Sequence, residues 1–166
     1  MVDVFTVMPE CYGDTIWARL ILKQSYNLKW LHIKGCNEVG KRFNENRYKN
    51  RLLIGIVDDD KLKDHSLKDF TFEILNGDSI SVLRKPDTDH YYVIVKPAIE
   101  TWLLKCAEYS KIRHNYDLKS LKKSMKTDAA SSDTRLLSFL NTIYQKNSPQ
   151  VEEMSKHLHD LLKTAR

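Results

Sequence analysis

The stretch Leu52-Leu-Ile-Gly-Ile-Val57, followed at once by Asp58-Asp-Asp60, decides the fold. Six consecutive residues without a charge are typical of a strand that is covered on both faces, as in the middle of a parallel sheet. The acidic triplet then ends the apolar run abruptly. We therefore expect 52–57 to lie inside a sheet, with helices packed against both of its faces.

The pattern on either side of this strand predicts an α/β fold. Further strands are expected at 2–8, 70–75, 79–83 and 91–95, with a short strand or a helix end at 28–34. A helix is expected from Asp14 to about Tyr26, with Asp14 or Thr15 as N-cap, and 36–49 as a helix or an ordered connection. After Pro97 the periodicity becomes helical, and it predicts helices near 99–106, 117–126, 134–145 and 150–164.

These elements predict a mostly parallel sheet flanked by helices, followed by an all-helical C-terminal third. We assign 1–105 to the α/β core and 106–166 to a helical extension packed on that core. No apolar run approaches the ~18–20 residues that a membrane span needs. The chain start has no basic segment, and Asp3 interrupts its apolar run, so we expect no signal peptide and a cytoplasmic protein.

The cysteines argue against a disulfide framework and against a structural zinc site. Cys11, Cys36 and Cys106 are odd in number, lie far apart and form no CxxC pair. We expect three reduced thiols in or near the core.

The net charge of +5 is concentrated in one segment, 101–126. This segment contains seven basic residues and only two acidic ones, Glu108 and Asp117, whereas acidic and basic residues are equal in number in the rest of the chain. The basic residues are Lys105, Lys111, Arg113, Lys119, Lys122, Lys123 and Lys126. A local basic segment is what contact with a polyanion needs, so we predict nucleic-acid binding by the six from Lys105 to Lys123. The alternative is a solvated helix face.

Acidic residues follow three of the expected strands at the same relative position. Glu10 follows 2–8, the triplet from Asp58 to Asp60 follows 52–57, and Glu100 follows 91–95. The carboxyl ends of parallel strands meet in one crevice, and hard oxygen ligands without His or Cys favour Mg²⁺ or Mn²⁺. If the chain stays extended, Asp58 and Asp60 face one ion together. Otherwise the triplet simply ends the strand and caps a helix.

A second motif, Gly35-Cys-Asn-Glu-Val-Gly40-Lys41, matches the GxxxxGK pattern of a phosphate-binding loop. Arg42 stands where the magnesium-ligating Ser or Thr belongs, and 31–34 makes a poor buried strand before the loop. A P-loop-like nucleotide binder is therefore the weakest of the functional hypotheses.

Two segments together resemble the Toprim (topoisomerase-primase) fold. The first is Val7-Met-Pro-Glu10-Cys-Tyr-Gly-Asp14, which is similar to the family's Glu after the first strand, often written EGxxD. The second is Ile54-Gly-Ile-Val-Asp58-Asp-Asp60-Lys61, which is similar to the family's later strand ending in DxD. Lys96-Pro-Ala-Ile-Glu100-Thr-Trp-Leu-Leu104 is similar to a segment of small stand-alone Toprim-like proteins, some tied to phage defence and to OLD-type nucleases. Cys11 stands where the family usually has Gly. The likeness covers about 2–105.

The resemblance implies a magnesium-dependent nuclease or other phosphodiesterase. Glu10 would be the general acid/base or a metal ligand, Asp58 and Asp60 would hold Mg²⁺, and Glu100 would complete a second site; Asp14 and Lys61 belong to the same motifs. Many OLD-type nucleases carry an ATPase domain, so a separate ATPase subunit is the protein partner that the resemblance suggests. The alternative is a non-catalytic module of the same fold that binds nucleic acid or protein. DNA, RNA and other phosphorylated substrates all remain open.

Overall fold

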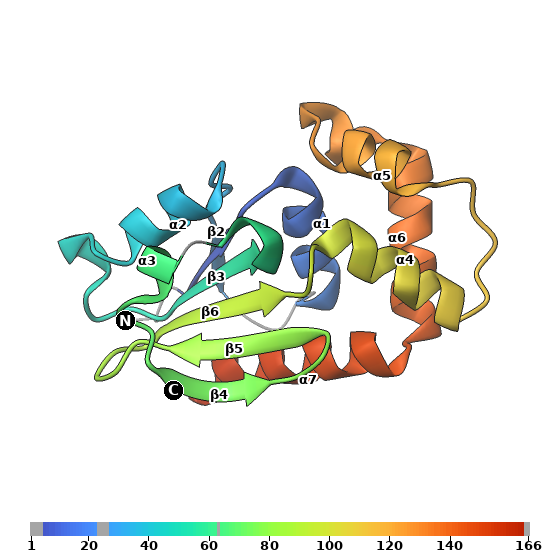
Figure 1. Cartoon of the computed structure of the whole chain (residues 1–166). Helices are drawn as coiled ribbons and strands as arrows, with labels where there is room; N and C mark the ends of the chain where they lie inside the picture. Colours follow the sequence, from blue (N-terminus) through green and yellow to red (C-terminus); the bar gives the residue numbers. More distant parts are fainter. Residues whose placement is uncertain (1–4, 23–26, 63, 165–166) are drawn as a thin grey trace.

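The computed structural model describes residues 5–22, 27–62 and 64–164, and it confirms an α/β fold with a mostly parallel sheet and a helical C-terminal third (Figure 1). Four neighbouring strands are parallel: β2 (Leu28–Trp30), β1 (Phe5–Pro9), β3 (Leu53–Asp58) and β6 (His90–Val95). Two antiparallel strands continue the sheet beyond β6: β5 (Ile80–Arg84) and β4 (Phe72–Asn76). The strand order is therefore β2-β1-β3-β6-β5-β4.

The apolar run that decides the fold forms β3, between β1 and β6. All of its residues are buried. Side chains alternate along a strand, so Ile54 and Ile56 pack into one hydrophobic cluster while Leu53 and Val57 pack into another on the opposite face. The sheet is thus covered on both sides, as the sequence predicts.

The helices divide into two groups along the chain. Within the first hundred residues lie α1 (Tyr12–Ile21), α2 (Cys36–Arg42), the 3₁₀ turns η1 (Asn46–Tyr48) and η2 (Asp59–Lys61), and α3 (Asp64–Leu67). After β6 come α4 (Ile99–Tyr109), α5 (Leu118–Met125), the 3₁₀ turn η3 (Asp128–Ser132), α6 (Thr134–Lys146) and α7 (Pro149–Thr164). The boundary expected after residue 105 falls inside α4. In the described ranges, no helix has the length and apolar character to cross a membrane.

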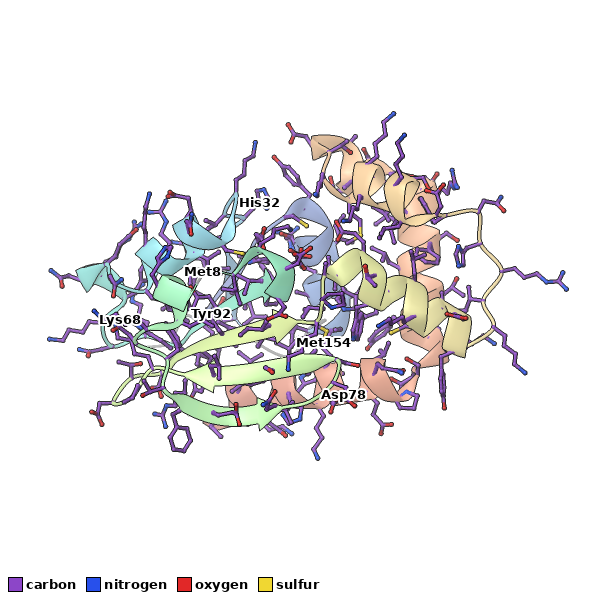
Figure 2. The ribbon with its side chains drawn as sticks, viewed as in Figure 1. Met8, His32, Lys68, Asp78, Tyr92 and Met154 are labelled. Atoms are coloured by element: carbon purple, nitrogen blue, oxygen red, sulfur yellow. The ribbon has the colours of Figure 1, made fainter. Side chains whose placement is uncertain are left out.

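Side chains on one face of the sheet share a single buried cluster with α1 and the C-terminal helices. In Figure 1, α7 runs alongside the antiparallel strands, and α4, α5 and α6 lie beyond the end at which β6 finishes. Trp17 of α1 meets Trp102 of α4 edge to face, with ring centroids 5.6 Å apart. The indole N–H of Trp17 donates to the sulfur of Met154 in α7 (Met154 is labelled in Figure 2). The other face carries α2 and α3. There Phe43 and Phe70 pack around Tyr92 of β6, with ring centroids 4.8 and 4.5 Å away from the Tyr92 ring.

The start of α1 differs from the prediction. The helix begins at Tyr12 with Cys11 as its N-cap, and neither Asp14 nor Thr15 caps it. The Cys11 sulfur accepts from the backbone N–H of Asp14 at 3.4 Å, and Asp14 Oδ2 accepts from the backbone N–H of Cys11 at 3.1 Å. This reciprocal capping box satisfies two N–H groups and places Asp14 inside the first turn. Residues 2–4 of the expected first strand, and 23–26 at the expected end of this helix, lie outside the described residues.

Candidate functional site

Glu10 and Asp58 lie side by side at the carboxyl edge of the sheet. Glu10 directly follows β1 and Asp58 ends β3, and these strands are parallel neighbours with Pro9 opposite Ile56. The backbone N–H of Asp58 donates to Glu10 Oε2 at 3.3 Å. Both residues are buried, with 6% and 1% of their surface exposed. The strand-end argument therefore predicts this pair correctly.

Lys61 forms an ion pair with both acids. It is the last residue of η2, one turn after Asp58, and its Nζ lies 3.0 Å from Glu10 Oε1 and also pairs with Asp58 Oδ2. Burial of Lys61 disfavours its charge, but the two carboxylates outweigh this effect and raise its pKa. Lys61 is therefore a fixed positive charge between two acids. Its side chain is 34% exposed, so the ammonium still reaches solvent.

Cys36 fixes the orientation of Glu10. It is the first residue of α2, and its thiol donates to Glu10 Oε2 at 2.9 Å. Burial, followed by the neighbouring Glu10, raises the pKa of the Cys36 thiol, which therefore stays protonated and keeps donating. Glu10 Oε2 thus holds two donors, the thiol and the Asp58 amide, while Oε1 turns toward Lys61.

Asp14 adds a third buried acid to this region. Burial raises its pKa well above the ordinary value, and the charge of Asp58 raises it further. Its Oδ2 accepts from Cys11, whereas Oδ1 is buried without a hydrogen-bond partner among the described residues. Burial likewise raises the pKa of Asp58, and the hydrogen bond from Lys61 opposes that rise. The acids around Glu10 therefore share one lysine, and Asp14 holds its proton more tightly than an exposed carboxyl does.

The N-terminus of α4 closes the site on the other side of Asp58. The backbone N–H of Ile99 donates to Asp58 Oδ1 at 2.8 Å. Both oxygens of Asp58 are therefore engaged, one by this N–H and one by Lys61. Hydrogen bonds to the charged carboxylate stabilise it despite its burial.

Two of the predicted metal ligands, Asp60 and Glu100, form no side-chain hydrogen bond or ion pair with Glu10, Asp58 or Lys61 among the described residues. The chain does not stay extended after Asp58, because residues 59–61 form η2; Asp60 is exposed and its backbone N–H donates to Pro97. Glu100 is buried in the first turn of α4, and its Oε1 has no partner within the described part of the chain. Within residues 5–22, 27–62 and 64–164, no group of three or more His, Cys, Asp or Glu side chains is arranged to hold a metal ion.

A cavity of about 280 Å³ opens beside Glu10. Its wall includes the stacked rings of Tyr12 and His32, 4.0 Å apart and 20° from parallel. Its full lining is Glu10, Cys11, Tyr12, His32, Lys34, Gly35, Lys61 and Lys126. Three lysines and one acid, Glu10, therefore line the cavity, and the positive charge favours the entry of an anion.

Of the basic segment, it is the end of α5 that reaches this cavity. Lys126 follows α5, which lies over the start of α1 (Figure 1). This close approach needs Gly13, because a Cβ at that position would lie 2.3 Å from Cε and 2.6 Å from Cβ of Met125. Most of the six predicted contacts are exposed side chains on α4, α5 and the connection between them, and none of the six lines the cavity.

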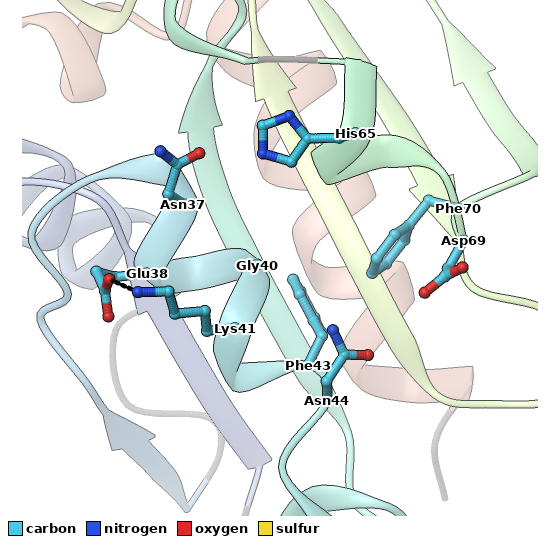
Figure 3. Close-up of a pocket in the computed structure, with 9 residues that line it drawn as sticks. All are labelled: Asn37, Glu38, Gly40, Lys41, Phe43, Asn44, His65, Asp69 and Phe70. Carbon is cyan, nitrogen blue, oxygen red and sulfur yellow. Dashed lines mark hydrogen bonds and ion pairs between the residues drawn. The ribbon is translucent and has the colours of Figure 1, made fainter.

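The GxxxxGK motif forms a helix and not a phosphate-binding loop. Residues 36–42 are α2, so Gly40 and Lys41 lie inside its last turn, and Lys41 pairs with Glu38 (Figure 3). A cavity of about 440 Å³ lies between α2 and α3, lined in part by Phe43, Phe70 and His65. This cavity is on the face of the sheet away from α1. Because 36–42 is helical, this segment does not have the backbone of a phosphate-binding loop.

Sequence reasoning missed Cys36, Lys34, Lys126 and the Tyr12–His32 stack. A usable signal was present for the first two. The segment 31–36 follows β2, a parallel neighbour of β1, so the same strand-end rule that selects Glu10 also selects this segment. No local sequence pattern predicts that Lys126 lines the cavity or that Tyr12 stacks on His32, because both depend on how distant segments pack.

No protein-family model matches the chain, and no curated protein or solved structure matches it significantly.

Proposed function

We propose that this chain is a Mg²⁺- or Mn²⁺-dependent phosphodiesterase of the Toprim-like kind, acting on nucleic acid as a nuclease. The observation that carries the proposal is the pair of Glu10 and Asp58, adjacent at the ends of β1 and β3 and sharing the ammonium of Lys61. Two carboxylates that already share one cation have the oxygen ligands that a divalent ion takes. A cytoplasmic location and a separate ATPase subunit as partner belong to the same proposal.

The residues present fit such an ion. Mg²⁺ commonly binds through one or two carboxylates and completes its shell with water and substrate phosphate, so Glu10 and Asp58 are a sufficient protein contribution. Lys61 would yield its place, and its partial exposure gives it room to turn toward the cavity. When bound, the ion supplies charge stabilisation at a phosphoryl oxygen and an acidified water.

The chain's own groups prepare the site for a phosphodiester. Cys36 and the Asp58 amide hold Glu10 Oε2, which leaves Oε1 as the oxygen that can bind a cation or accept a proton. Lys34, Lys61 and Lys126 draw the phosphate backbone toward a carboxylate that would otherwise repel it. Lys61, once displaced from the carboxylates, can donate to a phosphate oxygen in the cavity.

The test is cleavage of labelled single-stranded and duplex DNA and RNA with Mg²⁺, Mn²⁺ or chelator. Asp58→Asn and Glu10→Gln should each lower metal-dependent cleavage by at least about 100-fold, since a metal ion contributes several kcal/mol to such a step. Asp59→Asn is the matched control, because its side chain is exposed one residue away, and Asp60→Asn should behave like it. Cleavage that is absent from the wild type, or unchanged in Asp58→Asn and Glu10→Gln, refutes the proposal.

A second candidate is a non-catalytic binding module of the same architecture. One observation favours it: Lys61 already pairs with both Glu10 and Asp58, so each carboxylate has a cationic partner without a metal. Calorimetric titration separates the two candidates. The nuclease gives Mn²⁺ or Mg²⁺ binding heat that disappears in Asp58→Asn, whereas the binding module gives none.

A further inference from the structure

The stacked rings beside Glu10 belong to two segments that are distant in sequence. Tyr12 opens α1, and His32 follows β2 (His32 is labelled in Figure 2). Both are half-buried and both line the cavity. The neighbouring Asp128 of η3 raises the pKa of the Tyr12 hydroxyl, which therefore stays protonated near neutral pH. Burial lowers the pKa of His32, so this ring stacks as a neutral imidazole near neutral pH.

The charges around these rings are free to bind an anion. Lys34 and Lys126 are exposed, both line the cavity, and neither forms an ion pair with an acid in the part of the chain that the structure describes. Lys34 comes from the loop before α2 and Lys126 from the end of α5. An aromatic wall with cations at its rim is the combination that binds an unpaired base and its phosphate.

The size of the cavity restricts the ligand. The volume of about 280 Å³ is just below the ~300–1,000 Å³ of small-ligand pockets, which is the scale of a single nucleotide. We propose that this cavity binds one unpaired nucleotide, with its base against the Tyr12–His32 stack and its phosphate between Lys34 and Lys126. The choice of ligand class rests on the proposed function. The substrate is then a single strand, a strand end or a flipped-out nucleotide.

The test measures binding in chelator, where no cleavage occurs. The full chain is titrated against fluorescein-labelled ten-nucleotide DNA and RNA, single-stranded and duplex, by fluorescence anisotropy. Single strands should bind at least about 10-fold more tightly than duplexes, because only they present unpaired bases for stacking. Adenosine 5′-monophosphate should compete, and ribose 5-phosphate, which lacks the base, should compete more weakly.

Variants assign the binding to the rings and the lysines. Tyr12→Ala should weaken single-strand binding by about 5- to 150-fold, the loss expected for one stacked base, whereas Tyr12→Phe keeps the ring and stays within about 2-fold of wild type. His32→Ala provides the same test on the other ring should Tyr12→Ala unfold. Lys126→Gln should lower the salt dependence by about 0.7 in log–log slope, and Lys146→Gln, an exposed lysine of α6, should not.

The outcomes separate this inference from the proposed function. Equal affinity for duplex and single strand, equal competition by the two monophosphates, or unchanged binding in folded Tyr12→Ala or His32→Ala overturns the inference. Metal-dependent cleavage that needs Asp58 can survive each of those results. Conversely, the expected binding without any cleavage leaves the nucleotide site in place and refutes only the nuclease.

Discussion

Gly13→Ala tests the contact that brings α5, and with it Lys126, over the candidate site. In a helix, Ala is normally more stable than Gly by about 1 kcal/mol. Here the added Cβ would lie 2.3, 2.6 and 2.8 Å from Cε, Cβ and Cγ of Met125, which is fully buried. Overpacking of a filled core costs about 1–3 kcal/mol, so the substitution should destabilise the protein. The clash thus reverses the sign that helix propensity alone gives.

A double-mutant cycle isolates the clash. Met125→Ala alone removes a buried side chain and should cost about 2–5 kcal/mol. It also removes the Cγ and Cε contacts, but it keeps the Cβ that would lie 2.6 Å away from the new methyl group. Gly13→Ala should therefore lower the free energy of unfolding by about 1 kcal/mol or more less in the Met125→Ala background than in the wild type. Part of the destabilisation should persist there, because the contact with the Cβ of residue 125 remains.

Urea and thermal unfolding followed by circular dichroism measure the cycle. For a chain of this length, each kcal/mol moves the melting temperature by about 2–4 °C. Gly13→Ala should also weaken single-strand binding, because α5 has to move away from the cavity that Lys126 lines. A stabilised Gly13→Ala protein, or additive effects in the double mutant, would show that α1 and α5 do not meet as described.

Two further predictions concern the buried charges. The pKa of Asp14 is raised in the folded state. Between the ordinary carboxyl pKa and this raised pKa, the folded state therefore binds more protons than the unfolded state. The free energy of unfolding consequently falls as the pH rises through this range. Asp14→Asn should therefore raise the melting temperature at pH 7 and lose this advantage near pH 3.5, while a pH-independent difference would contradict the assignment. Lys61→Met leaves Glu10 and Asp58 without their cationic partner, so the melting temperature of this variant should fall at pH 7. Mg²⁺ should then raise the melting temperature of the variant by more than it raises that of the wild type. No response to Mg²⁺ would favour the non-catalytic module.

The sheet was predictable because its signals are local. The run 52–57 is apolar throughout, and an uninterrupted apolar strand has only one stable position, the interior of a covered sheet. The strand-end rule then places Glu10 beside Asp58 without any knowledge of side-chain contacts. These predictions rest on backbone geometry that every parallel sheet shares.

The remaining site residues depend on how the backbone turns after each strand. Asp60 fails as a partner of Asp58 because η2 forms within one residue and directs Lys61, not Asp60, back to the carboxylates. The first turn of α1 depends on a cysteine acting as an N-cap, a role for which Ser, Thr, Asp and Asn are the usual residues. Propensity rules thus favoured Asp14 over Cys11.

The turn that joins Asp58 to Lys61 has a consequence for the life of the protein in the cell. The acid and its counter-charge are three residues apart, so a newly synthesised chain carries both in a single segment. This segment therefore needs no metal ion to supply the counter-charge of Asp58, and we expect the protein to fold without Mg²⁺ or Mn²⁺. If it is the nuclease proposed here, its working rate follows the supply of the ion while its amount does not, and restored supply switches on molecules already made.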